Sequence, residues 1–226
     1  MKIITLAASL ATVSATAIAA GTLTADEVID NIDSSSWAVD PTDFGMTATE
    51  YQRKETDIFA ENMIGRSGLN EFFHFDGLSK ATDVWVVTPN VDTVYSVAVI
   101  DAREGFSVEL PEVENRFISL HVQDQNHIFV DYTWDAGLHE FVADVIETDY
   151  IIIGARVRTD ATQEDLDHIN DVLLPTMVIA ASSAVPYETG TTEAEIADLR
   201  DALLVEWGNL PDMHDSVQFD INDVSD

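Results

Sequence analysis

The sequence predicts an α+β fold, in which an antiparallel β-sandwich is flanked by helices on its N-terminal and C-terminal sides. Two observations lead to this class. Helix-capping patterns occur before residue 70 and after residue 160, and the stretch between them holds short runs of β-branched and aromatic residues separated by turns. The order is therefore helices, strands, helices, and not the alternation of strand and helix that a parallel sheet requires.

Five segments are expected along the 226 residues: a signal peptide at 1–20, an N-terminal helical segment at 21–69, the β-sandwich core at 70–160, C-terminal helices at 161–210 and an acidic tail at 211–226. Lys2 gives the first segment its positive start, and residues 3–20 are apolar or small. The triplet Ala17-Ile18-Ala19 predicts cleavage near Ala20 or Gly21. An uncleaved membrane anchor is the alternative, but the segment is poor in leucine and only weakly apolar. We therefore expect a periplasmic or secreted protein without a stable membrane anchor after cleavage.

Capping boxes, in which a threonine precedes a glutamate by three residues, predict helices that begin after Thr24 and Thr47. The second helix should end near Gly65 or Gly68. C-terminal to the core, helices should begin after Thr162 and in the segment 192–195. Pro175 should end or kink the first of these two helices. The apolar residues expected on the buried sides of these helices are Val28, Ile29 and Ile32; Tyr51, Ile58, Phe59 and Met63; Leu166, Ile169, Val172 and Leu173; and Ile196, Leu199 and Leu203.

Strands are expected where β-branched residues gather or where apolar and polar residues alternate. These segments are 84–87, 94–100, 106–110, 118–123, 128–133 and 150–157, with 72–75 as a short strand or loop. Several short strands with turns between them favour a sandwich.

The net charge is extreme, with 42 acidic against 10 basic residues and a formal charge of −32. Such a chain repels phosphate backbones and anionic lipid surfaces, so we expect neither a nucleic-acid partner nor a charged membrane partner. The acids are spread along the whole chain, which favours solubility in a salty medium over a clustered cation site. Cysteine is absent, so thiol and disulfide chemistry are excluded.

The most specific polar run is 88–96, which lies between two expected strands. Pro89 and Asn90 are typical of a rigid corner. Alternatively, Asp92 and Tyr95 flank a pocket, as an acceptor and as a donor or base. Both interpretations stay open on the sequence.

A second polar pattern lies in the strand expected at 118–123, where Ser119, His121 and Gln123 share one face. That face should meet water, a pocket or another subunit. No Gly-x-Ser-x-Gly elbow accompanies the serine, so a serine hydrolase is not expected. The histidines and neighbouring acids show no metal-binding spacing, and no phosphate-binding glycine loop is present, so the sequence indicates neither a metal nor a cofactor.

Several segments together resemble the bacterial family known as domain of unknown function 1254. The residues that carry the resemblance are Asn70, Phe72, Phe73 and His74; Pro89, Asn90, Asp92, Thr93, Tyr95 and Ser96; Arg116, Phe117, Ser119, Leu120 and Asp124; Tyr150, Ile152 and Gly154; and Arg156, Asp165 and Leu166. The resemblance spans roughly 47–180 and implies an immunoglobulin-like β-sandwich with helices beside it. Thr88 stands where the family motif has arginine, and within these 226 residues we do not expect the second, jelly-roll-like domain that many relatives carry.

Two functions are therefore expected of an exported envelope protein. The first is an enzyme, or an enzyme-like protein, that acts on a small molecule. Its catalytic candidates are Asp92, Tyr95 and His74, and its substrate-binding candidates are Asn90, Arg116 and His121. The second is a non-catalytic binding or assembly module of the periplasm, whose partner is a small-molecule ligand, a separate companion-domain protein or another copy of the chain.

Overall fold

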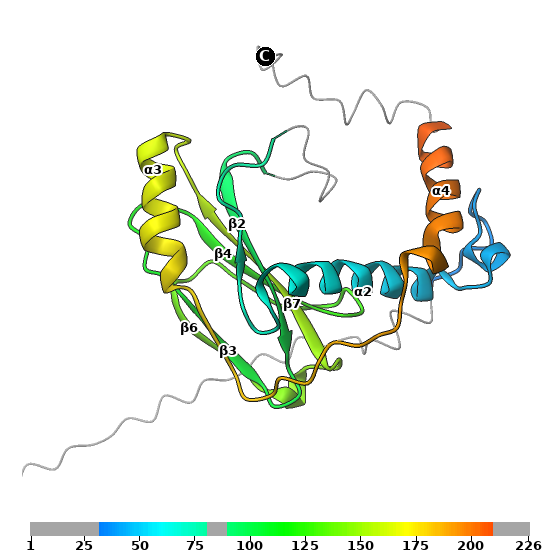
Figure 1. Cartoon of the computed structure of the whole chain (residues 1–226), viewed down its shortest axis with the longest axis horizontal. Coiled ribbons are helices and arrows are strands. Elements are labelled where there is room, and N and C mark those ends of the chain that lie inside the picture. Colours follow the sequence, from blue (N-terminus) through cyan, green and yellow to red (C-terminus); the bar gives the residue numbers. More distant parts are fainter. Residues whose placement is uncertain (1–31, 81–89, 210–226) are drawn as a thin grey trace, which may run out of the picture.

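The computed structural model of the chain describes residues 32–80 and 90–209 (Figure 1). The expected signal peptide, the helix after Thr24, the strand at 84–87 and the acidic tail lie outside the described residues. Within them the chain is an α+β protein with two antiparallel sheets, as the order of helices and strands predicts.

The larger sheet has five strands in the order β1-β2-β7-β4-β5, and all its neighbours are antiparallel. These strands are β1 (Phe73–His74), β2 (Thr93–Asp101), β7 (Tyr150–Arg158), β4 (Ile118–Asp124) and β5 (Phe129–Thr133). Each corresponds to an expected segment. The central strand β7 is joined on one side to β2 and on the other to β4, so it runs through the middle of the sheet (Figure 1).

The smaller sheet has three strands in the order β6-β3-β8: β6 (Gly137–Phe141), β3 (Phe106–Leu110) and β8 (Val178–Ala181). Only β3 is predicted by the sequence. β8 lies inside the segment 161–210 that we expected to be helical, and this expectation is wrong for those four residues. Its backbone pairs with β3, whose ladder supplies the hydrogen bonds that an isolated four-residue segment lacks.

Helix α2 (Ala48–Ser67) begins at the predicted capping box. The hydroxyl of Thr47 accepts from the N–H of Glu50 at 3.1 Å, and the Glu50 carboxylate accepts from the N–H of Thr47 at 2.7 Å. The helix ends at Gly68, whose φ of 105° suits glycine. Gly65, the other expected stop, lies inside the helix.

The remaining helices are short, except for α4 (Glu193–Asn209), which buries Ile196 and Leu199 as predicted. The others are η1 (Pro41–Phe44), η2 (Ala143–Val145) and a continuous stretch of α3 (Gln163–His168), the π-helical turn η3 (Ile169–Leu173) and η4 (Leu174–Thr176), which stops just after Pro175. The wider π-helical turn alters the angular spacing of side chains. Val172 is therefore 50% exposed, against our expectation, whereas Ile169 and Leu173 are buried.

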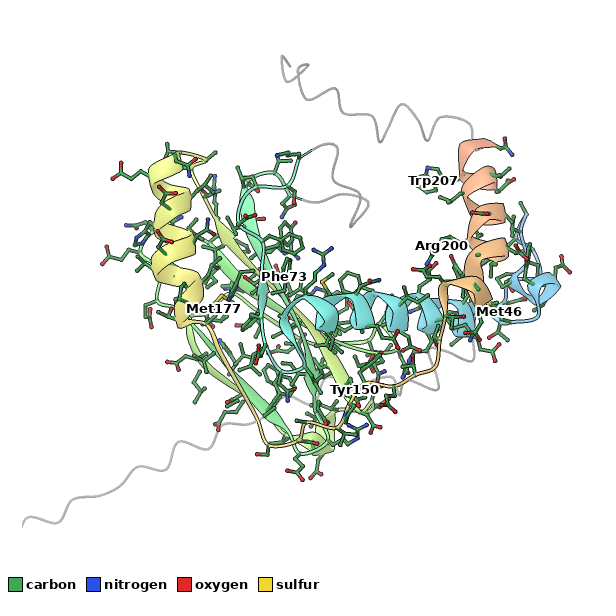
Figure 2. All side chains as sticks on the ribbon, in the orientation of Figure 1. Met46, Phe73, Tyr150, Met177, Arg200 and Trp207 are labelled. Atoms are coloured by element: carbon green, nitrogen blue, oxygen red, sulfur yellow. The ribbon has the colours of Figure 1, made fainter. Side chains whose placement is uncertain are left out.

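One hydrophobic cluster joins the facing sides of the two sheets with the α3–η4 stretch. Ile100, Leu120 and Ile153 of the larger sheet contribute to it, together with Val108 of β3. Met177, which follows η4, belongs to the same cluster (Figure 2). The other face of the larger sheet packs on the second half of α2, through Ala60, Met63, Val97, Val99 and Tyr150. Helix α2 covers only part of this face, because its first half runs on toward α4 (Figure 1).

Helix α4 stands at the N-terminal end of α2 and is held there by ion pairs (Figure 2). Arg200 binds Glu55 at 2.6 Å, and Lys54 binds Glu195 at 3.1 Å. No helix among the described residues is both long enough and apolar enough to cross a membrane.

An extended segment, 182–192, connects β8 with α4 and is tied to the larger sheet. The fully buried carboxylate of Asp101 accepts from the Ser183 hydroxyl at 2.6 Å and from the Val185 N–H at 2.7 Å. Farther along, the Tyr187 hydroxyl donates to Asp57 of α2 at 2.7 Å. These bonds fix the segment's path beneath α2.

Candidate functional site

The residues that the sequence singles out do not meet at one point. Register explains the largest separation: His74 pairs with Ser96, whereas Tyr95 pairs with Arg156. Successive residues of a strand point to opposite faces. Tyr95 therefore lies on the face that α2 partly covers, and His74 lies on the opposite face, at the edge of the sheet.

His74 is half-buried and already has partners. Its Nδ1 is 2.7 Å from the Ser96 hydroxyl, and its ring stacks on Phe72 with centroids 5.5 Å apart. Burial lowers the pKa of His74, so the ring is neutral at neutral pH. These contacts assign it to the packing of the sheet edge.

Asn90 and Asp92 are exposed and form the corner that leads into β2. The N–H of Asn90 donates to the Tyr95 hydroxyl at 2.7 Å, and the backbone carbonyl of Asp92 accepts from the Thr159 N–H at 3.0 Å. The corner interpretation therefore describes these two residues. The hydroxyl of Tyr95 is bonded to this corner, and Tyr95 also lines a hollow on the larger sheet.

Arg116 is held by a carboxylate and not directed at an open pocket. Its guanidinium forms a two-pronged pair with Asp165, with Nη1 3.0 Å from Oδ2, and also donates to the backbone carbonyl of Arg158 at 2.6 Å. Asp165 accepts further bonds from the Thr159 hydroxyl and the Asp160 N–H. A polar hollow of about 270 Å³ lies beside this pair. Since the cation is already neutralised, we assign the pair a structural role.

The better candidate is on the free part of the larger sheet. Pairing places Tyr95, Arg156 and Ser119 in one row across β2, β7 and β4, and the next row holds Gly154 and His121. Over these rows lies a hollow of about 230 Å³, which we call the sheet hollow. It is lined by Phe59 of α2, Tyr95 and Val97 of β2, His121 and Gln123 of β4, and Ile152, Ile153, Gly154 and Arg156 of β7.

Buried polar atoms in these rows have no partner among residues 32–80 and 90–209. They are the hydroxyl of Ser119, which is fully buried, and the Nε2 of His121. A buried polar group without a hydrogen bond costs about 1–3 kcal/mol. Of these two residues, His121 lines the sheet hollow, and an unpartnered atom at a concave surface is typical of a place where a ligand or ordered water completes the bonding.

The electrostatics of the sheet hollow are set by His121 and Arg156. Burial lowers the pKa of His121, and the positive charge of Arg156 lowers it further. The imidazole is therefore neutral at neutral pH. Arg156 is half-buried, and its Cζ lies 5.9 Å from the centre of the Tyr95 ring. No carboxylate in the described parts of the chain forms an ion pair with it.

A row of aromatic side chains continues from His121 along the edge strand β5. The register of β4 and β5 shifts between Val122 and Gln123, and this bulge puts both Phe129 and Tyr132 on the face of His121. The ring of Phe129 stacks on His121 with centroids 4.3 Å apart and planes 7° apart. The imidazole is therefore held in one orientation at the wall of the sheet hollow.

Sequence reasoning placed Tyr95 and His121 among the candidates but did not assign Gly154 or Arg156 a role in the site. Both carry a signal, because they interrupt the apolar run of β7: a glycine in the middle of a strand and an arginine two residues later. Elsewhere, no three histidine, aspartate or glutamate side chains of the described residues gather as a metal ion would require.

Comparison with known proteins supports the resemblance noted from the motifs. Residues 69–176 match the family model described as "Protein of unknown function (DUF1254)", and this range includes Tyr95, Ser119, His121, Gly154 and Arg156. The chain is also similar to the crystal structure of the VPA0106 protein from Vibrio parahaemolyticus, with 14% identity and a TM-score of 0.44 over 64% of this chain. The match spans 42% of that protein's length. No curated protein matches the chain.

Proposed function

We propose that this chain is an exported binding protein of the cell envelope that holds a small organic anion in the sheet hollow. The observation that carries this proposal is Arg156, a half-buried cation without a carboxylate partner in 32–80 and 90–209. The export rests on the sequence of residues 1–20, with its positive start, apolar stretch and small-x-small triplet.

The other arginines in comparable surroundings support this interpretation. Four of them form ion pairs: Arg53 with Asp57, Arg103 with Asp101 and Asp149, Arg116 with Asp165, and Arg200 with Glu55 and Glu193. In a chain with 42 acidic residues, carboxylates to pair with Arg156 are abundant. Arg66 and Arg158 also lack ion pairs within the described residues, but both are exposed to solvent, which solvates their charge. Arg156 is the half-buried exception among these cations, and its planar fork of donors suits a carboxylate.

The surroundings of Arg156 favour an organic anion over an inorganic one. The imidazole of His121 supplies a polar group at the lining, whereas Phe59, Val97 and Ile152 supply apolar walls. Binding sites for small molecules combine a mostly apolar lining with a few polar groups in this way. A compact, fully hydrated anion would gain nothing from those apolar walls.

The test is calorimetric titration of the mature chain with acetate, succinate and benzoate, each compared with its neutral amide. We expect at least one of the carboxylates to bind and its amide to bind more weakly. Arg156→Gln should weaken binding about tenfold or more, since a charge-assisted hydrogen bond is worth about 1.5–3 kcal/mol. The matched control is Arg158→Gln, which removes the same charge two residues away, where the side chain is exposed and does not line the sheet hollow. Equal affinities for both variants, or no binding of any carboxylate to the wild type, would refute the proposal.

A second candidate function is an enzyme that acts on the bound anion, and His121 is the residue that favours it. A neutral imidazole whose Nε2 lacks a partner in the described chain can accept a proton from a ligand beside it. Turnover by the wild type separates the two functions. A binding protein leaves the anion that the titrations identify unchanged and should keep most of its affinity in His121→Gln. An enzyme converts that anion, and His121→Gln should keep the binding and lose the turnover.

The proposal also includes the type of β-sandwich. We infer an immunoglobulin-like sandwich, supported by two antiparallel sheets that share one hydrophobic cluster and by the motifs that resemble the family. The export is tested by sequencing the N-terminus of the protein recovered from the envelope. It should begin near Ala20 or Gly21, and an intact Met1 in that fraction would contradict cleavage.

A further inference from the structure

Gly154 lies in the middle of β7, the central strand of the larger sheet. Glycine is unfavourable there, because it gives up backbone freedom on folding and offers no side chain to pack. Its position is regular: it pairs with Val97 on β2 and with His121 on β4, without a register shift on either side. If the fold itself required glycine here, the residue would have a positive φ, or a neighbouring atom would lie too close to the position of a Cβ.

Neither of these structural reasons for glycine applies at Gly154. The described glycines with a positive φ are Gly45, Gly68, Gly105, Gly137 and Gly190, and Gly154 is not one of them. A Cβ at Gly154 would meet no atom of the described chain within 4 Å, so no neighbouring backbone excludes a side chain. By contrast, a Cβ at Gly105 would come within 2.6 Å of the Phe141 carbonyl oxygen. The remaining reason for glycine within a strand is the close approach of a ligand.

The space above Gly154 has a definite shape and composition. It is part of the sheet hollow, and three rings stand around it: Phe59 from α2, Tyr95 from β2 and His121 from β4. Phe129, stacked behind His121, keeps that ring in place. At Gly154 the floor is strand backbone without a side chain, which is flat compared with a surface of side chains. Flat rings in offset or edge-to-face contact with other rings are favoured over saturated rings of similar size.

The size of the sheet hollow limits the ligand. Pockets for drug-sized ligands measure about 300–1,000 Å³, whereas this hollow measures about 230 Å³. It therefore suits a molecule of about one ring. Arg156 is two residues from Gly154 along β7, on the same face, so it meets one end of a molecule that lies on Gly154.

We infer that the ligand is a small planar carboxylate, such as an aromatic acid, whose flat body lies on Gly154 and whose carboxylate meets Arg156. This inference rests on the proposed binding of an organic anion and specifies the class of ligand. Gly154 is then the residue that determines specificity, because any side chain there would occupy the ligand's place.

The first experiment compares three probes by calorimetric titration of the mature chain: benzoate, cyclohexanecarboxylate and benzamide. Benzoate should bind at least tenfold more tightly than cyclohexanecarboxylate, which carries the same charge on a puckered ring. Benzamide, which keeps the planar ring without the charge, should bind at least tenfold more weakly than benzoate.

The second experiment fills the space with Gly154→Ala and Gly154→Val. Both variants should fold with an unchanged or higher melting temperature, because a side chain in a regular strand position with open space restricts the unfolded chain without strain. Benzoate affinity should fall at least tenfold in the alanine variant and further in the valine variant. The matched control is Gly65→Ala in α2, where a Cβ also meets nothing in the described chain within 4 Å. This variant should keep the affinity of the wild type.

The outcomes separate the inference from the proposal on which it rests. If benzoate, cyclohexanecarboxylate and acetate bind equally and all depend on Arg156, the anion-binding function stands and the planar ligand is refuted. If Gly154→Ala keeps a wild-type melting temperature and wild-type benzoate affinity, the role of Gly154 is refuted. If no carboxylate binds the wild type, the proposed function fails and the inference fails with it.

Discussion

Arg116 and Asp165 join the approach to β4 with the first turn of α3 through two parallel N–H···O bonds, although 49 residues separate them in the chain. Asp165 collects two more bonds from the loop 159–160, so one carboxylate holds three segments together. These contacts explain why an arginine that the sequence presents as a substrate ligand instead supports the architecture.

The first prediction concerns this carboxylate. Asp165→Asn should lower the free energy of unfolding by about 1–3 kcal/mol at pH 7, because it leaves a partly buried guanidinium without its partner. The guanidinium of Arg116 holds the pKa of Asp165 well below its usual range. Its stabilisation is therefore present above the pKa of the unfolded chain, about 3.9, and is lost as the pH falls toward the folded value. Urea unfolding from pH 7 to pH 3 measures both effects.

The control for Asp165 is Asp171→Asn, which removes the same charge from an exposed position in the same helical stretch. Its stability should stay within about 0.5 kcal/mol of the wild type. If the two variants unfold at the same urea concentration, the ion pair contributes nothing beyond a surface charge.

The second prediction is a loss of stability between pH 7 and pH 5. Burial lowers the pKa of His74, His121 and His127 below the ordinary histidine value. As the pH falls through about 6.5, the unfolded chain takes up these protons before the folded chain does, and folding becomes less favourable. His121→Gln should reduce the loss of unfolding free energy between pH 7 and pH 5 by the contribution of one histidine. His168→Gln, at an exposed position, is the control, and a profile that His121→Gln leaves unchanged would contradict the assignment.

The third prediction tests the capping box of α2. Thr47→Ala removes the acceptor for the Glu50 N–H and should cost about 1 kcal/mol of stability. Thr47→Ser keeps the hydroxyl and should cost much less. Thermal unfolding of both variants measures the difference. Since α2 covers one face of the larger sheet, equal melting temperatures would mean that the first turn of α2 is not coupled to the fold.

The fourth prediction follows from the charge of −32. The melting temperature should rise as sodium chloride increases from about 0.01 M to 0.15 M, because the Debye length falls from about 30 Å to about 8 Å and the repulsion among carboxylates is screened. Binding of benzoate should strengthen over the same range, since the chain as a whole repels an anion that approaches it. A melting temperature independent of salt would show that the acidic groups are far enough apart to be screened by water alone.

The features predicted correctly from the sequence depend on neighbouring residues. The capping box at Thr47 and the β-branched run of β2 can each be recognised within ten residues. β6 and β8 were missed because their strand character comes from pairing with β3. His74 and Tyr95 seemed to share a pocket, but their faces depend on the pairing register, which no local pattern specifies.

The same reasoning applies to the site. Tyr95 was predicted as a candidate because it lies in the polar run 88–96, and His121 because it shares the polar face of an alternating strand with Ser119 and Gln123. Arg116 was misleading, since its partner Asp165 lies 49 residues away and only the fold brings them together. Gly154 becomes informative only when the space above it is known to be open. Whether a side chain already has a bonding partner or can bind a ligand depends on the residues that surround it in the folded protein.

The buried carboxylate of Asp101 has a consequence for the order in which the protein can fold. Its partners Ser183 and Val185 follow it by 82 and 84 residues, and its strand β2 pairs with β7, which begins only at Tyr150. The first half of the newly made chain supplies Arg103, which donates to Oδ1 of Asp101, but it lacks β7 and the donors to Oδ2. Contacts so distant in sequence slow folding. The bonds that bury one oxygen of Asp101 can therefore form only after the chain has been synthesised as far as Val185.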